Sequence, residues 1–131
     1  MLLPTNQLVL AGLGDGLGVI RNPDGQVDKV ISRSTEFSNQ TLSLGTFHRL
    51  SDWTVKVLDE FPQNGAVMLA TDGIADDLID DQLSEFINWL DKEFSDRPNL
   101  LRRRALYKEF SRWPTPGHQD DKTLAIIIRR G

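Results

Sequence analysis

The chain has 131 residues, of which 39% are hydrophobic and 26% charged, and this balance fits one globular domain spanning residues 1–131. It contains no cysteine and only two histidines, which excludes disulfides and thiolate or histidine-rich metal sites and leaves oxygen ligands for any metal. The net charge of −4 makes the chain as a whole a poor electrostatic match for nucleic acid.

No apolar run in the sequence has the length that crosses a bilayer. Residues 1–4 also lack the charged and apolar regions of a signal peptide. We therefore expect a cytoplasmic protein that has neither a membrane nor a nucleic acid among its partners.

A glycine-rich segment, residues 12–18, follows a short apolar run at residues 7–11 that is predicted to be a strand. Its glycines do not match a dinucleotide-binding fingerprint, because the third glycine of G-x-G-x-x-G would fall on Leu17 or Val19. We interpret the segment as a strand crossing with a bulge or a close packing contact, in preference to a phosphate cradle.

The next segment is predicted to form antiparallel strands around a tight turn. Val19 and Ile20 run into Asn22-Pro23-Asp24-Gly25, a strong turn signal, and apolar residues alternate behind it at residues 27–31. Residues 32–51 are polar and poorly periodic, so we expect a loop there.

The second half of the chain combines strand and helix patterns. Residues 55–58 alternate as a strand does, and residues 66–70 form a continuous apolar run, which is typical of a strand buried on both faces. Apolar residues at helical spacing predict a helix over 83–94, and Pro98 can begin a second one that ends at about residue 112. A last apolar run at 123–128 predicts a closing strand. This order indicates an α+β domain with a mainly antiparallel sheet, helices on one face, and two helices inserted before the last strand.

Two carboxylate clusters lie next to the predicted buried strands. Asp72 and Gly73 follow the strand at 66–70, and Asp120 and Asp121 precede the closing strand. Carboxylates at strand ends have fixed backbones, which suits a site for a hard cation. The residues themselves leave a second interpretation open, in which Asp72 caps a turn and the other two are solvated loop acids.

Charge is unevenly distributed along the two predicted helices. Residues 72–96 are strongly acidic, whereas residues 97–112 are basic and include Arg102-Arg103-Arg104. Such runs are typical of solvated helix faces, and a docking face on the basic helix is the alternative.

Several segments together resemble the C-terminal part of the PP2C family of metal-dependent protein serine/threonine phosphatases, of the bacterial type. Ala70-Thr71-Asp72-Gly73-Ile74 resembles the family's Ser/Thr-Asp-Gly-Leu segment, and Asp120-Asp121-Lys122-Thr123 resembles its closing Asp-Asn-x-Thr segment. Gly14-Asp15-Gly16 resembles an earlier Gly-Asp-Ser/Gly segment, and Gln63-Asn64-Gly65 falls where the family has a turn. The resemblance runs from about residue 7 to residue 129 and implies half of an α-β-β-α sandwich.

The resemblance implies a role for two of these acids. Asp72 and Asp120 would be ligands in a two-metal centre holding manganese or magnesium, which activates water for attack on a phosphoserine or phosphothreonine protein substrate. Asp121 stands where the family has asparagine, so either Asp120 or Asp121 would be the carboxylate that faces the metal. Asp15 lies at a position that is structural in the family, and no residue is assigned a catalytic role.

The family's N-terminal metal-bridging motifs, a Glu-Asp pair and an Asp-Gly-His-Gly turn, do not occur in this sequence. We therefore expect a phosphatase portion that is catalytically incomplete alone and holds metal weakly, since hard-ion affinity depends on ligand count. A non-catalytic binding or regulatory module that retains half of the fold is the alternative. In either case an open sheet edge would favour self-association.

Overall fold

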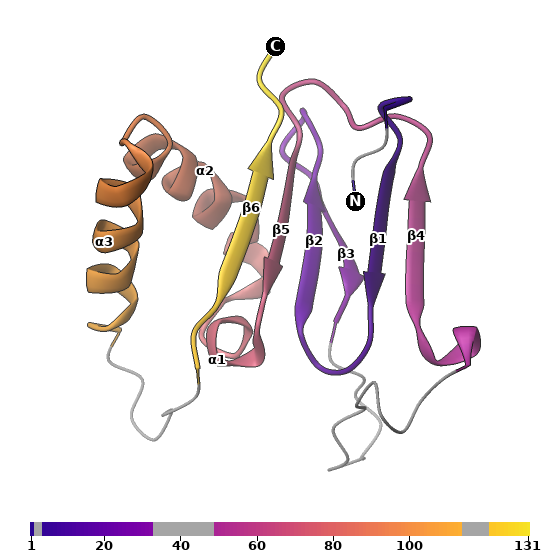
Figure 1. The fold of residues 1–131 in the computed structure, drawn as a ribbon, viewed down its shortest axis with the longest axis horizontal. Coiled ribbons are helices and arrows are strands. Elements are labelled where there is room, and N and C mark those ends of the chain that lie inside the picture. The colour runs from indigo at the N-terminus through magenta and orange to yellow at the C-terminus, as the bar shows by residue number, and fades with distance from the viewer. Residues whose placement is uncertain (2–3, 33–48, 114–120) are drawn as a thin grey trace.

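The computed structural model describes residues 1, 4–32, 49–113 and 121–131 (Figure 1). In chain order its elements are β1 (Leu8–Gly12), β2 (Leu17–Arg21), β3 (Val27–Ile31), a 3₁₀ helix at Leu50–Asp52, β4 (Thr54–Leu58), β5 (Ala66–Ala70), α1 (Asp72–Ala75), a second 3₁₀ helix at Asp80–Gln82, α2 (Leu83–Phe94), α3 (Asn99–Phe110) and β6 (Leu124–Ile128). The predicted α+β class is confirmed, as are the two long helices between the last two strands. Most of the predicted loop at 32–51 lies outside the described residues.

The strands form two antiparallel sheets. Four strands pair in the order β3-β2-β5-β6, and β1 pairs with β4 in a sheet of two strands. The turn between β2 and β3 has the geometry that its sequence predicts. Gly25 has a φ of 89°, which favours glycine, and its N–H donates to the carbonyl of Asn22 over 3.0 Å.

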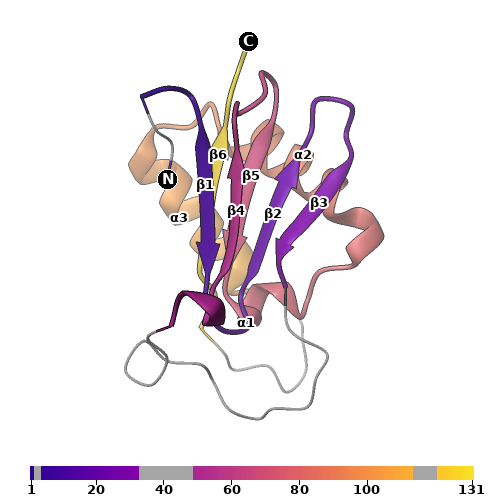
Figure 2. The same cartoon turned by 90° about the vertical axis from the view of Figure 1, so that its right-hand side faces the viewer.

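Three layers result from this arrangement (Figures 1 and 2). The helices cover one face of the four-stranded sheet, where Val19, Met68 and Ile87 lie in one buried cluster. The two-stranded sheet covers part of the other face, where Leu8 and Phe61 lie in a second cluster. Because β2 and β5 have cores on both sides, residues 17–20 and 66–70 are apolar without alternation. The sheet–sheet–helix order is the half-sandwich that the resemblance implied.

The glycine-rich segment carries the chain from one sheet to the other. A side chain at Gly12 would bring its Cβ to 2.6 Å from Ile31, and one at Gly18 would come within 2.8 Å of the same residue. The β2–β3 register also shifts between Gly18 and Val19. The interpretation of this segment as a bulged, closely packed crossing is therefore confirmed.

Helix α3 is attached to the rest of the domain less tightly than α2 is. No residue of α3 is fully buried, whereas α2 buries a stripe that includes Leu83, Ile87 and Leu90. The Arg102 guanidinium donates to the backbone carbonyls of Ser95 and Arg97, each over 3.0 Å, and so joins α3 to the end of α2. Within the basic run 102–104, this arginine therefore has a structural role. None of the helices that the described residues form is both long and apolar enough to span a membrane.

Candidate metal centre

Asp72 lies where the chain leaves the buried strand β5. The strand ends at Ala70, Thr71 keeps an extended backbone with φ −72° and ψ 163°, and Asp72 begins the one-turn helix α1. The Asp72 Oδ1 atom accepts a hydrogen bond of 2.8 Å from the N–H of Gly73, which is buried. The carboxylate is half-buried and is held at the edge of the sheet.

Thr71 fastens the start of β6 to this edge. Its N–H donates to the carbonyl of Thr123 over 3.0 Å, and its Oγ1 accepts from the Thr123 N–H over 3.0 Å. The same Oγ1 donates to the carbonyl of Asp121 over 2.9 Å. These three bonds hold Asp121, which follows Asp120 in the sequence, beside Thr71, which precedes Asp72. Asp120 itself lies outside the described residues, as does His118.

A second carboxylate shares the surroundings of Asp72. Asp15 and Asp72 both line a hollow of about 370 Å³, together with Gly16, Thr71 and Thr123. The strand register explains this placement, because Leu17 of β2 lies opposite Ala70 of β5 in an antiparallel pair. Asp15 lies two residues before Leu17, and Asp72 lies two residues after Ala70. The two aspartates must therefore lie at the same level of the sheet. The sequence did not place Asp15 beside Asp72, and the pairing of β2 with β5 shows that both residues line one hollow.

The chemistry of this hollow suits a hard cation, because carboxylate and hydroxyl oxygens are the donors that magnesium and manganese prefer. Within the ranges that the structure describes, however, no three histidine, cysteine, aspartate or glutamate side chains gather into a metal-holding group. Asp15 and Asp72 are the carboxylates that the structure places in this hollow.

A buried salt bridge next to the Thr71 hydrogen bonds also holds the start of β6. Lys122 forms a salt bridge with Asp77, and these side chains are 16% and 5% exposed. The Lys122 ammonium also lies 5.2 Å from the centroid of the Trp113 ring, within the range of a cation–π interaction. The lead-in to β6 is therefore bound both to the end of β5 and to the chain that follows α1.

Replacing Thr71 with valine is expected to lower the free energy of unfolding by about 1–3 kcal/mol, because valine keeps the shape but loses both side-chain hydrogen bonds. Amide hydrogen exchange at Thr123 should accelerate, since its N–H donates to the Thr71 hydroxyl. Thr54→Val, at an exposed position of β4, is the matched control and should change neither quantity. Unchanged exchange at Thr123 in Thr71→Val would show that the hydroxyl does not hold this edge.

The chain is similar to one protein family and to one solved structure. The family model described as protein phosphatase 2C matches residues 1–108, a range that includes Asp15 and Asp72 and ends before Asp120. A solved structure, the crystal structure of RsbX in complex with magnesium, is 14% identical with a TM-score of 0.49, and the match covers 93% of this chain and 49% of that one. The chain thus spans about half the length of that protein. No curated protein matches the sequence. Because the family model covers most of the chain, the chain belongs to the protein phosphatase 2C family.

Proposed function

We propose that this chain supplies the C-terminal part of a metal-dependent protein serine/threonine phosphatase centre, in which Asp72 and Asp120 bind manganese or magnesium. Family membership supports the reaction class. The observation that carries the proposal is the set of Thr71 hydrogen bonds, because they bring the chain next to Asp120 to the strand end that bears Asp72.

The residues present would help to position the ions. Gly73 fixes one oxygen of Asp72, and the other accepts no hydrogen bond from the residues that the structure describes, so it can coordinate a cation. Asp15 adds negative charge to the same hollow, which raises the local attraction for a divalent ion. When bound, manganese or magnesium would supply an activated water for in-line attack on the phosphate of phosphoserine or phosphothreonine.

We further propose that the bridging carboxylates come from a polypeptide segment beyond this sequence, since the Glu-Asp and Asp-Gly-His-Gly motifs do not occur in it. Apolar side chains are left uncovered where such a segment could pack. Val55 and Val57 on β4 are 48% and 54% exposed, and Ile127 on β6 is 50% exposed. These residues lie on edge strands of two different sheets, and the two valines share one face of β4, so a partner could cover an apolar strip there.

This chain by itself is expected to show no manganese-dependent hydrolysis of p-nitrophenyl phosphate and only weak manganese binding by calorimetry, because its carboxylates are too few. Adding a separate polypeptide that carries the family's Glu-Asp and Asp-Gly-His-Gly segments should produce hydrolysis. Asp72→Asn should abolish that hydrolysis, since one metal ligand loses its charge.

Asp59→Asn removes the same charge from an exposed position and is the matched control, for which full hydrolysis is expected. Robust hydrolysis by the chain alone, lost in Asp72→Asn, would show that the site needs no further carboxylates. Hydrolysis that survives Asp72→Asn in the mixture would contradict the role of Asp72.

The second candidate function is a non-catalytic binding or regulatory module. The exposed valines of β4 favour it, because an edge strand with an apolar face can pair with a second copy of the chain or with a partner. The same mixing experiment separates the two functions. A module would bind the added polypeptide, or associate with itself in sedimentation, without producing hydrolysis.

A further inference from the structure

The β1–β4 sheet covers only part of the face of the four-stranded sheet against which it lies. Val67 of β5 is 3% exposed and belongs to the cluster between the two sheets, whereas Leu69 of β5 and Ile127 of β6 are 39% and 50% exposed. All three side chains share one face, because Val67 and Leu69 are two residues apart in one strand and Ile127 lies opposite Val67. Apolar side chains are therefore bare where the β1–β4 sheet ends.

Strand β1 forms the edge of the smaller sheet that borders this bare area. In Figure 2, β1 lies toward β6, whereas β4 lies toward β3. The chain that leaves β1 also comes close to the area, because Leu13 lines the hollow of about 370 Å³ together with Leu69 and Asp72. A further strand on the free side of β1 would thus lie over Leu69 and Ile127.

The backbone of β1 has hydrogen-bonding groups on that free side. The Val9 N–H donates to the Met1 carbonyl over 2.8 Å, and the Met1 ammonium donates to the Val9 carbonyl. Val9 thus points both groups away from β4, and Ala11, two residues on, does the same in an antiparallel ladder. No backbone hydrogen bond reaches Ala11 on this side from the residues that the structure describes. The reciprocal bonds of Met1 and Val9 show that this edge accepts a backbone in the antiparallel direction.

We propose that a β-strand of the polypeptide segment that would complete the phosphatase centre pairs with the free edge of β1, antiparallel to it. The strand bonds to the backbone of Ala11 and continues the ladder that Met1 begins. Its alternate residues are apolar, because one of its faces covers Leu69 and Ile127. The identity of this partner rests on the proposed function, whereas the free edge and the bare apolar face do not.

The direction of the added strand suits this partner. An antiparallel strand begins beside Gly12, near the hollow that Asp72 lines, so the residues before it reach that hollow. A second copy of β1 does not fit the same place. Its inward side chains, Leu8 and Leu10, are 1% and 4% exposed in their own core, so they cannot also cover Leu69 of a neighbour.

Amide hydrogen exchange, followed by NMR, tests the pairing without any measurement of hydrolysis. The separate polypeptide that carries the Glu-Asp and Asp-Gly-His-Gly segments is added to the isotopically labelled chain in the presence of manganese. The Ala11 N–H should then exchange about tenfold more slowly or less, because it enters a ladder. The Val57 N–H is the control within the same molecule. Val57 lies opposite Val9 and points its N–H to the far edge of the sheet, so its exchange should not change.

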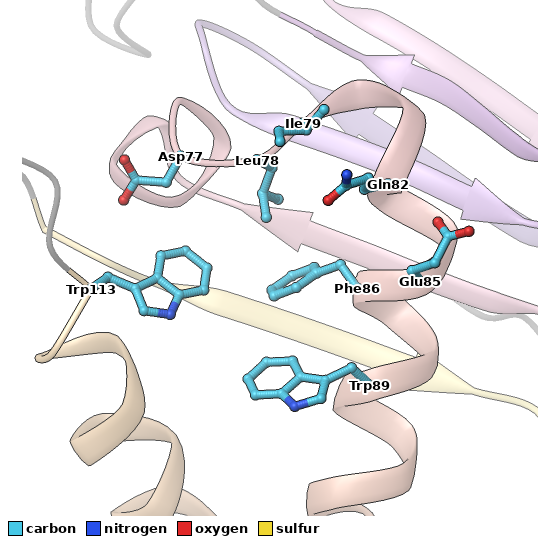
Figure 3. A pocket seen from close by; sticks show the side chains of 8 residues that line it. All are labelled: Asp77, Leu78, Ile79, Gln82, Glu85, Phe86, Trp89 and Trp113. Atoms are coloured by element: carbon cyan, nitrogen blue, oxygen red, sulfur yellow. The ribbon is translucent and has the colours of Figure 1, made fainter.

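Two serine variants test whether the added strand covers the bare face. Ile127→Ser should weaken binding of the same polypeptide about three- to tenfold in calorimetry, because apolar area beneath the strand is lost. Ile79→Ser is the matched control and should leave binding unchanged. It removes the same side chain at a position that is 61% exposed and lies between α1 and α2 (Figure 3).

The outcomes separate this pairing from the proposed function. Hydrolysis by the mixture without protection of Ala11 would overturn the pairing and leave the proposed function intact. Protection of Ala11 without hydrolysis would support the pairing and contradict the phosphatase role. Protection of Val57 in place of Ala11, equal losses in the two serine variants, or no binding of the polypeptide would overturn the pairing.

Discussion

Replacing Phe61 with alanine is expected to lower the free energy of unfolding by about 3–5 kcal/mol, the usual cost of truncating a buried aromatic side chain. Phe61 is 1% exposed and fills the space between the two sheets, in one cluster with Leu8, Ile20 and Val67. Its N–H also donates to the carbonyl of Asn6 over 2.9 Å, so the backbone cannot easily move to close the cavity. Chemical denaturation followed by circular dichroism measures the change.

Tyr107→Ala provides the control for the loss of Phe61, because it also truncates an aromatic ring but at a position that is 76% exposed. Tyr107→Ala should change the free energy of unfolding by less than about 0.5 kcal/mol, not counting the gain from the higher helix propensity of alanine. A cost below 1 kcal/mol for Phe61→Ala would mean that the inter-sheet core does not hold the β1–β4 sheet in place.

The second large effect is expected at the buried ion pair near the candidate metal centre. Lys122→Met should lower the free energy of unfolding by about 3 kcal/mol, because the Asp77 carboxylate loses this cation while only 5% of its side chain is exposed. The cation–π contact with Trp113 is lost in the same substitution. The measurement is again denaturant unfolding, at a pH where the carboxylate is ionised.

Lys29→Met tests whether burial is the cause. Lys29 pairs with Asp80, but the side chains of this pair are 35% and 71% exposed, so water already solvates the aspartate. Exposed pairs of this kind contribute about 0–1 kcal/mol, and the control should cost no more than that. Equal costs for the two lysine variants would show that burial does not strengthen the pair at Lys122.

Local sequence patterns predicted the elements well where those patterns reflect burial. The apolar run 66–70 coincides with β5, and the helical apolar stripe between residues 83 and 94 lies in α2. Helix α3 ends at Phe110, close to its predicted end at about residue 112, although none of its residues is fully buried.

Pairing between distant segments was the part that the sequence did not reveal. The pattern at residues 55–58 predicts a strand but does not name β1 as its neighbour, and the division into two sheets follows from that pairing. For the same reason Asp72 was found at its strand end, whereas its neighbour Asp15 was not. The packing of Trp113 on Phe86 also depends on tertiary structure, because residues far apart in the sequence bring the two rings to 5.9 Å between centroids.

The contact of Gly12 and Gly18 with Ile31 has a consequence for how this sequence can vary over time. A side chain at Gly12 or at Gly18 would overlap the side chain of Ile31. Ile31 lies in β3, whereas the glycines lie at the two ends of the crossing segment. A methyl group gained at either glycine requires a smaller side chain at position 31, since the closest distances are already below what a Cβ tolerates. These positions are therefore expected to accept substitutions in concert, so that a change at one is neutral only after a compensating change at another.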